Sequence, residues 1–483
     1  MQACAGFLQA QPLTPTARIA AMMTMRFFIG GFLFLFGCAA TPFPPMQRAE
    51  SRDLPLRIKA DIRIRPDVDR APLRDYAEPM HAPVRLLAIV TLISTHALAG
   101  DWPHYRGPSQ NGSSAETIGK LPVGGPRELW RVQLGTGLSS ITVADGRVLS
   151  AGYKDGNEVL YCLNPANGRV MWTHSWKAKL GDYLFEGGPR ATPTADGERV
   201  YMLGADGHIA CVSAASGKPL WEKNLVSDFG GRRPEWGYSG SPTIDGENVI
   251  LDCGGKGAST IALNKTTGEL VWKSGDDEAG YGSAIIAQFG GARRILLVKA
   301  DALVALDAED GSEAARFDWK TSYKVNAATP LLAGARVVVS SAYNHGAAAF
   351  DFSGGKPSQA WFTKSLHAHF NSPVASGGFV FGMDGEAGQR RAALVCLDLV
   401  SGDEKWRAKQ VNNGSLILAG DKLLIVTESG DLVLAAASGA AYRELARKKV
   451  LSGRCWVQPA FANGKVWCKN NTGELVALDL AGK

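Results

Sequence analysis

A turn-and-tryptophan signal that recurs along residues 130–483 constrains this chain more than any other feature. In its clear copies a Trp follows a Gly by four residues. These copies are Gly168 with Trp172, Gly217 with Trp221, Gly268 with Trp272, and Gly402 with Trp406; weaker ones contain Gly311, Gly355 with Trp361, and Gly439. Successive glycines lie 37 to 51 residues apart, which is the length of one four-stranded propeller blade. We expect the Trp side chains to pack between neighbouring blades as core residues.

A second signal precedes the first in every unit. A small or polar residue, often followed by Pro, opens an apolar strand, a turn with Gly or Asp, and another apolar strand, as in "SPTIDGENVILD". Asp-Gly and Asn-Gly turns between apolar runs are strong hairpin signals, because these residues tolerate the positive φ of tight turns. Eight copies begin at Ser139, Ala191, Ser241, Ser283, Ala328, Ser372, Ser415 and Gln458. Each unit therefore predicts four antiparallel strands.

The two ends of the repeat region complement each other. The C-terminal "GELVALDLAGK" supplies a third strand without its Trp-bearing partner, and residues 126–134, "PRELWRVQL", supply that partner at the other end. Pairing the two within one blade closes the ring and leaves no open sheet edge. The predicted fold is all-β, an eight-bladed β-propeller of four-stranded antiparallel blades, closed by pairing of N- and C-terminal strands.

The first hundred residues predict export. From Met80 the chain has a basic n-region, a short apolar h-region and the cleavage motif Ala97-Leu98-Ala99, and this stretch is too short to span a bilayer as a helix. We expect a leader at residues 1–79 that is disordered or a mis-assigned start, a signal peptide at 80–99 cleaved after Ala99, and a propeller at 100–483. An earlier apolar stretch ends at Cys38 in a loose lipoprotein box. Membrane association is expected only if Cys38 is lipidated.

Charge and cysteine usage argue against two classes of protein, those that bind nucleic acid and those that carry c-type haem. Residues 1–99 carry 11 Lys and Arg against 7 Asp and Glu, so four of the six net positive charges lie there and the repeat region carries only +2. A nearly neutral body gives no electrostatic case for nucleic acid. Cys162, Cys211 and Cys396 share one repeat position and are expected to be buried small hydrophobes. A disulfide between Cys455 and Cys468 is compatible with the pattern. The absence of a CxxC sequence argues against c-type haem.

The repeats resemble the pyrroloquinoline-quinone (PQQ)-like repeat family. Its "ALDxxTGxxxW" unit is matched by "CLNPANGRVMW", "ALNKTTGELVW" and "CLDLVSGDEKW", and the opening "DWPHYRGPSQNG" resembles the start of secreted propellers of this kind. The resemblance covers residues 101–483. It is specific for fold and weak for function, because the family includes quinoprotein dehydrogenases as well as propellers without a known cofactor, such as the lipoprotein subunit of the outer-membrane BAM complex.

Loops that lead into the innermost strands should converge over the central channel. They carry aromatic, amide and cationic side chains that could hold a planar polar ligand by stacking and hydrogen bonding. The predicted ligand-binding residues are Arg190, Trp236, Tyr238, Tyr281, Lys320, Tyr323, Asn326, His369, Asn371 and Trp456. The alternative is that these groups cap strand ends and bind channel water.

Carboxylates bear on a catalytic interpretation, since the resemblance implies that a quinoprotein dehydrogenase needs a general base and Ca²⁺ ligands. Asp276 and Asp277 are the weak catalytic candidates, and an acidic run in a surface loop is more often simply solvated. The chain also lacks the adjacent-cysteine disulfide of quinoprotein alcohol dehydrogenases, and its blades are compact. No metal ligand is predicted.

Two functions follow from these observations. The first is a non-catalytic binding or scaffold protein of the cell envelope, periplasmic or extracellular, monomeric, with an envelope protein or a small exported ligand as partner. The alternative is a PQQ- and calcium-dependent dehydrogenase that oxidises an alcohol or sugar.

Overall fold

The predicted tight turns join neighbouring strands of the fold. Asp145 and Gly146 lie between the first two strands of a blade with φ angles of 48° and 70°, and Asn463 and Gly464 repeat this arrangement with 52° and 68°. Positive φ at both central residues is typical of the type I′ hairpin, whose twist matches that of the flanking strands. Local turn chemistry therefore sets the strand order within each blade.

The computed structural model describes residues 100–483 except 120, 122–124, 182–184, 389–390 and 482–483. All of these belong to one unit, residues 96–483. The predictions for the leader, for the signal peptide and for Cys38 lie outside the described residues. No helix in the described part of the chain has the length and apolar character needed to cross a membrane.

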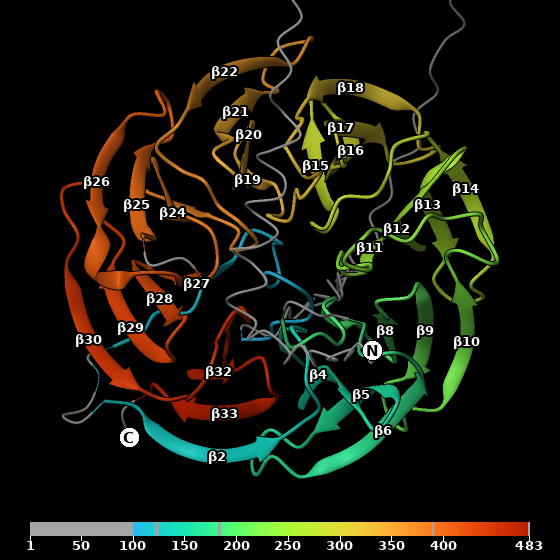
Figure 1. Ribbon diagram of the computed structural model, residues 1–483, viewed down its shortest axis with the longest axis horizontal. Coiled ribbons are helices and arrows are strands. Elements are labelled where there is room, and N and C mark those ends of the chain that lie inside the picture. Colours follow the sequence, from blue (N-terminus) through green and yellow to red (C-terminus); the bar gives the residue numbers. More distant parts are fainter. Residues whose placement is uncertain (1–99, 120, 122–124, 182–184, 389–390, 482–483) are drawn as a thin grey trace, which may run out of the picture. The chain divides into compact units, whose positions relative to one another are not determined.

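Within the described residues the strands form eight sheets arranged in a ring, one sheet per blade (Figure 1). The bounds of blades 1 to 4 are as follows: blade 1, β3 (Thr142–Ala144), β4 (Arg147–Lys154), β5 (Asn157–Leu163) and β6 (Val170–Lys177); blade 2, β7 (Thr194–Asp196), β8 (Arg199–Leu203), β9 (His208–Ser213) and β10 (Pro219–Asn224); blade 3, β11 (Thr243–Asp245), β12 (Asn248–Gly255), β13 (Ala258–Asn264) and β14 (Leu270–Ser274); blade 4, β15 (Ile285–Phe289), β16 (Ala292–Val298), β17 (Ala302–Asp307) and β18 (Glu313–Asp318).

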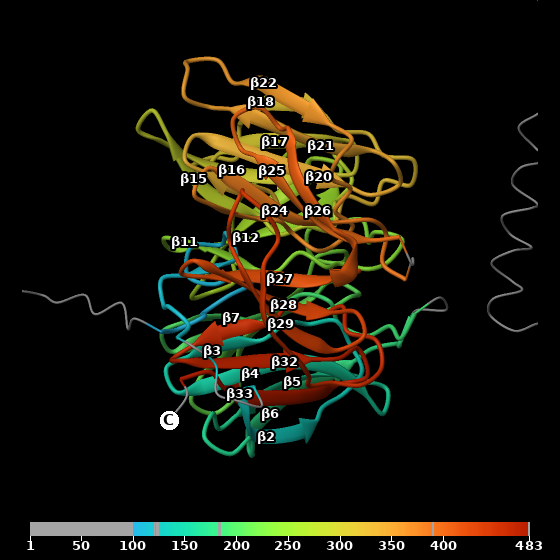
Figure 2. The ribbon, with the colours of Figure 1, turned by 90° about the vertical axis from the view of Figure 1, so that its left-hand side faces the viewer.

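The bounds of blades 5 to 8 are as follows: blade 5, β19 (Leu331–Ala333), β20 (Arg336–Ser341), β21 (Gly346–Asp351) and β22 (Ser358–Thr363); blade 6, β23 (Val374–Ser376), β24 (Phe379–Asp384), β25 (Ala393–Asp398) and β26 (Glu404–Ala408); blade 7, β27 (Gly414–Ala419), β28 (Lys422–Thr427), β29 (Asp431–Ala436) and β30 (Glu444–Lys449); blade 8, β31 (Ala460–Ala462), β32 (Lys465–Lys469), β33 (Glu474–Asp479) and β2 (Arg127–Gln133). A 3-10 turn, η1 (Lys409–Val411), joins blades 6 and 7. The fourth strand of each blade lies on the perimeter, and the side view shows β27 and β28 running across the thickness of the ring (Figure 2).

The ring is closed by the chain ends, as the sequence predicts. Strand β2 pairs antiparallel with β33, with Trp130 opposite Ala477 and Arg127 opposite Asp479. Trp130 thus occupies the same place in blade 8 that Trp172, opposite Cys162, occupies in blade 1. The eight-bladed fold and its closure are confirmed.

The Gly-to-Trp signal holds adjacent blades together. Trp221 of blade 2 is buried, and its indole Nε1 donates to the backbone oxygen of Lys265 in blade 3 at 3.0 Å. A Cβ on Gly268 of blade 3 would lie 2.7 Å from the Trp221 ring, and Gly268 has a φ of +71°. Glycine is therefore required here both for its backbone conformation and for the close approach of the ring. The predicted packing of Trp between blades is confirmed.

Small polar residues near the start of the repeats form a belt around the channel through blades 1 to 6. The backbone N–H of Ser140 donates to the Thr192 hydroxyl, and the same step repeats from Thr192 to Ser241, from Ser241 to Ser283, from Ser283 to Thr329 and from Thr329 to Ser372, at 2.9 to 3.2 Å. Between the last blade and the first, the Ser140 hydroxyl donates to the backbone oxygen of Gln458 at 2.6 Å. Inner strands cannot pair with one another, so these hydroxyls satisfy buried N–H groups that would otherwise lack partners.

Described cysteines are buried and free. Cys162, Cys211 and Cys396 are fully buried, as predicted from their shared repeat position. Cys455 and Cys468 do not form a disulfide. Burial raises the pKa of the Cys455 thiol to about 12 and that of Cys468 as well. These thiols are protonated core groups and poor nucleophiles.

An N-terminal segment, residues 100–118, covers one end of the channel (blue in Figure 1). Trp102 exchanges two backbone hydrogen bonds with Val143 of blade 1. The buried guanidinium of Arg106 donates to the backbone oxygen of Pro373, next to blade 6, at 2.6 Å. Strand β1 (Ser113–Ser114) then pairs parallel with β27 of blade 7. These contacts with blades 1, 6 and 7 fix the segment as a floor under the channel.

Candidate functional site

A central cavity of about 250 Å³ lies above this floor. Its base is Tyr105 from the N-terminal segment, and its lower wall consists of hydroxyls of the belt. Its upper wall consists mainly of aromatic side chains on loops. A concave site lined by apolar surface with a few convergent polar groups is the form that ligand sites usually take.

The aromatic side chains form a continuous arc. Ring centroids are 4.7 Å apart between Phe185 and Trp456, 5.1 Å between Trp456 and Phe370, 5.0 Å between Phe370 and His369, and 5.2 Å between His369 and Tyr343. The Tyr343 hydroxyl and His369 Nε2 lie 3.0 Å apart. Burial lowers the pKa of His369 to about 4, so its imidazole is neutral at pH 7. The arc therefore presents uncharged rings to a ligand.

One arginine lines the cavity, and a second lies behind its aromatic wall, paired with a glutamate. Arg190 lines the cavity, and its guanidinium donates to the backbone oxygen of Gly188 at 3.3 Å. Arg454 stacks on Trp456, with the guanidinium carbon 4.7 Å from the ring centroid, and forms an ion pair with Glu186 at 3.0 Å. Stacked arginine pre-organises an aromatic surface at low entropic cost.

The loops bring together six of the ten predicted ligand-binding residues. Those that line the cavity are Arg190, Trp236, Tyr281, His369, Asn371 and Trp456. Tyr323 lies outside the lining, is 56% exposed, and extends the arc through an edge contact with Tyr343 at 5.0 Å. Lys320 is exposed and also lies outside the lining.

Two other predicted residues hold the backbone together. The Asn326 amide is fully buried and donates to the backbone oxygens of Lys299, Ala300 and Trp319. The Tyr238 hydroxyl donates to the backbone oxygen of Cys253 at 2.9 Å. For Asn326 and Tyr238 the capping interpretation describes the contacts that the structure shows, because their polar atoms are occupied inside the fold.

The carboxylates singled out as catalytic candidates lie away from the cavity. Asp277 forms a bidentate pair with Arg316, at 2.9 and 2.7 Å, and the hydrogen bonds from that guanidinium lower the pKa of Asp277. Asp276 accepts a hydrogen bond from the backbone N–H of Gly257 in a hairpin turn. Neither residue lines the cavity, and their catalytic role stays an untested prediction.

Sequence reasoning missed four aromatic lining residues: Tyr105, Phe185, Tyr343 and Phe370. Tyr343 lies in the hairpin between β20 and β21. In an antiparallel blade this hairpin lies at the same end as the loop into the innermost strand, so both loop sets face the cavity. That rule would have found Tyr343, whereas Tyr105 depends on the path of the N-terminal segment across the ring.

Fold and cavity together define a closed propeller with an axial cavity. The sequence profile described as outer membrane protein assembly factor BamB matches residues 117–209 and 155–408, which is more than half of the chain. The chain belongs to this family of PQQ-like propellers. No curated protein matches it.

Solved structures share the fold at low sequence identity. BamB from Moraxella catarrhalis is 15% identical, with a TM-score of 0.53 over 73% of this chain and 97% of that one. A quinohemoprotein alcohol dehydrogenase from Pseudomonas putida HK5 is 13% identical, with a TM-score of 0.60 over 80% and 81%. A europium-containing methanol dehydrogenase is 12% identical, with a TM-score of 0.59 over 79% and 89%. At these identities the likeness establishes the fold alone.

Proposed function

We propose that this protein is a non-catalytic binding propeller of the bacterial cell envelope, exported by the signal peptide at residues 80–99. Its partner is another envelope protein, or a small exported ligand, that inserts an apolar or aromatic group into the central cavity. The observation that carries the proposal is the lining: aromatic rings, small hydroxyls, amides and Arg190, with no Asp or Glu among the described residues that form it. The match to the BamB family profile supports the same proposal.

The lining does not fit the alternative, a PQQ- and calcium-dependent dehydrogenase. Calcium takes six to eight oxygen ligands, usually with carboxylates among them. The side-chain amide of Asn371, a lining residue, is already engaged, because it donates to Asn413 and accepts from the Ser415 hydroxyl. Arg190 and the aromatic arc could meet a planar anion, which is the one observation in favour of quinone binding. No lining carboxylate among the described residues could serve as general base.

Quinone addition separates the two functions. Purified protein is mixed with PQQ and Ca²⁺, desalted, and assayed for quinone absorbance and for dye reduction with alcohols and sugars. We expect no retained quinone and no turnover. Retained quinone together with turnover would show that the protein is a dehydrogenase.

Photo-crosslinking tests the binding surface directly. A photoreactive phenylalanine analogue replaces Tyr323 at the edge of the arc, and a matched variant carries it at Phe362, which is 46% exposed on the outermost strand of blade 5. In envelope extracts we expect a discrete adduct at position 323 and none at 362. Equal adducts at both positions would contradict binding at the cavity.

A further inference from the structure

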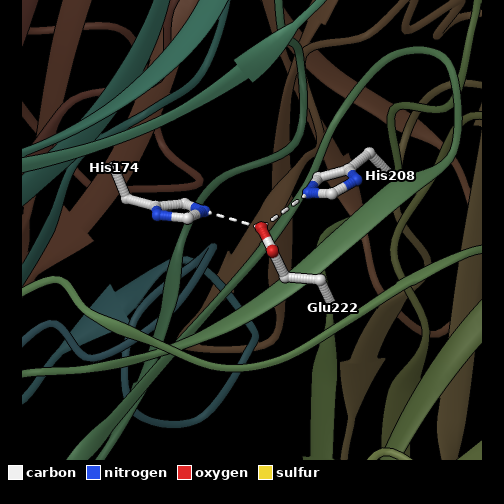
Figure 3. Close-up of side chains that lie close together, drawn as sticks. All are labelled: His174, His208 and Glu222. Carbon is white, nitrogen blue, oxygen red and sulfur yellow. Dashed lines mark hydrogen bonds and ion pairs between the residues drawn. The ribbon is translucent and has the colours of Figure 1, made fainter.

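A cluster of two histidines and one glutamate lies on the perimeter of the ring, at the joint between blades 1 and 2 (Figure 3). His174 comes from β6 of blade 1, and His208 and Glu222 come from β9 and β10 of blade 2. Both imidazoles point their Nε2 atoms at the same carboxylate oxygen, at 2.9 Å for His174 and 3.2 Å for His208. None of the three residues lines the central cavity.

Repeat geometry explains why these side chains meet. His174 is two residues after Trp172, so it faces blade 2 as that Trp does. Glu222 is opposite Ala210, two residues from His208, so Glu222 and His208 are diagonal neighbours on one face of the sheet. The fold therefore holds three donor atoms from two blades at one point.

We propose that His174, His208 and Glu222 form a binding site for a divalent transition metal ion of the zinc class, which links blades 1 and 2. Imidazole nitrogen with one carboxylate is a donor set that zinc uses, with one position left for water or another ligand. A tetrahedral zinc ion with bonds of about 2.1 Å holds its ligand atoms about 3.4 Å apart. Here all three donor atoms lie within 4.8 Å of one another, so small side-chain rotations suffice.

A neighbouring aromatic ring orients His208 within the cluster. Trp176 stacks on His208, with centroids 4.8 Å apart, and its own Nε1 donates to the buried carboxylate of Glu158 at 3.0 Å. That contact fixes the plane of the ring, as outer groups do at metal sites. Glu222 is 38% exposed, which leaves an open path for an ion.

The other blade joints supply an internal comparison. The position of Glu222, one residue after the repeat Trp, is basic in blades 3, 4, 6, 7 and 8: Lys273, Arg316, Arg407, Arg447 and Arg131. The position of His208 is Ala302 in blade 4 and Ala393 in blade 6, and the position of His174 is Thr363 in blade 5. Among the described residues, this joint holds the one group of three such donors. Glu222 thus departs from the basic residue that five other blades carry at its position, which indicates a local role that the fold does not require.

Zinc titration of the tag-free, EDTA-treated protein tests the site by calorimetry. We expect one equivalent of Zn²⁺ per chain, and binding at least about tenfold weaker in each of His174→Thr, His208→Ala and Glu222→Gln. The two histidine variants carry residues that other blades already have at these positions, so they should fold, and unchanged melting temperatures without metal would verify this. His345→Ala, a half-buried histidine in blade 5, is the matched control and should bind as the parent does.

A second readout is thermal stability. Zn²⁺ should raise the melting temperature of the parent and of His345→Ala, and this rise should vanish in the three site variants, because an ion that binds only the folded state stabilises it. Zinc binding that survives all three substitutions, or no binding by the parent, would overturn the proposal.

Discussion

Two joints between blades contain a fully buried lysine, and the chain satisfies each lysine differently. Lys299, between β16 and β17 of blade 4, donates to the carboxylate of Asp252 in blade 3 at 2.6 Å and to Thr260 and Ser259. Lys469 of blade 8 donates to three backbone oxygens at the start of blade 1, those of Gly137, Ser139 and Ala151, at 2.9 to 3.1 Å. No carboxylate contacts Lys469 among these partners.

This difference shows that a counter-charge stabilises a buried ammonium group more fully than neutral hydrogen-bond acceptors do. Backbone oxygens satisfy the hydrogen-bonding capacity of an amine, but they only partly replace the hydration of a positive charge. Burial accordingly lowers the pKa of Lys469 to about 7. The stability of the joint between blades 8 and 1 therefore changes with pH near neutrality. The joint between blades 3 and 4 instead depends on the ion pair of Lys299 with Asp252.

The largest effect is expected from Asp252→Asn. This change leaves the Lys299 ammonium buried without its counter-charge, which typically costs about 3–5 kcal/mol. Urea denaturation should show this loss in the free energy of unfolding. The double variant Asp252→Asn with Lys299→Met should recover part of it; a single variant as stable as the parent would show that the pair is not coupled.

Lys469→Met should be the next largest, at about 2–3 kcal/mol near pH 9, because buried backbone oxygens lose the hydrogen bonds of the neutral amine, which has two N–H donors. The loss should grow as pH rises from 7 to 10. In that window the unfolded chain still holds the lysine proton that the folded chain has released, so the stability of the parent rises with pH by up to about 1.4 kcal/mol per unit. Unfolding curves of both proteins at pH 7, 8 and 9 measure the difference. A constant difference would contradict the pKa shift.

Glu158→Gln tests a third joint, between blades 1 and 2, where the stability of the parent should fall rather than rise with pH. Glu158 of blade 1 accepts from Trp176 Nε1 and from the backbone N–H of Ala205 in blade 2, and burial raises its pKa to about 7. Stability from the protonated acid is complete below the unfolded pKa of about 4.3 and is lost as pH rises through 7. The variant should match the parent at pH 5 and exceed it by about 1–2 kcal/mol at pH 8. Melting temperatures of variant and parent at pH 5 and pH 8 measure this difference. Equal values at pH 8 would contradict the raised pKa of Glu158.

Arg127→Ala should have the smallest effect, below about 1 kcal/mol. Arg127 pairs with Asp479 across the closing strands at 3.0 Å, but its side chain is 68% exposed, and exposed ion pairs add little. Chemical denaturation should give a midpoint close to that of the parent. A loss as large as that of Lys469→Met would mean that the surface pair, rather than the buried lysine, secures the closure.

The sequence by itself determined the architecture. Blade number, strand order and the pairing of β2 with β33 were all readable, because each depends on turns and strand patterns within about 50 residues and on a period that repeats. Gly268 illustrates this, since its turn and its contact with Trp221 follow from one recurring signal. Six of the ten predicted ligand-binding residues also reach the central cavity, because loops into innermost strands must converge on the axis.

Only the tertiary structure decided which side chains meet. Asn326 turns into the fold to satisfy backbone oxygens, while Tyr105 reaches the cavity because the N-terminal segment crosses the channel. His174 and Glu222 are 48 residues apart and join one cluster because their blades pack side by side. A repeat fixes the course of the backbone, but contacts between blades depend on rotamers and burial that no local pattern encodes.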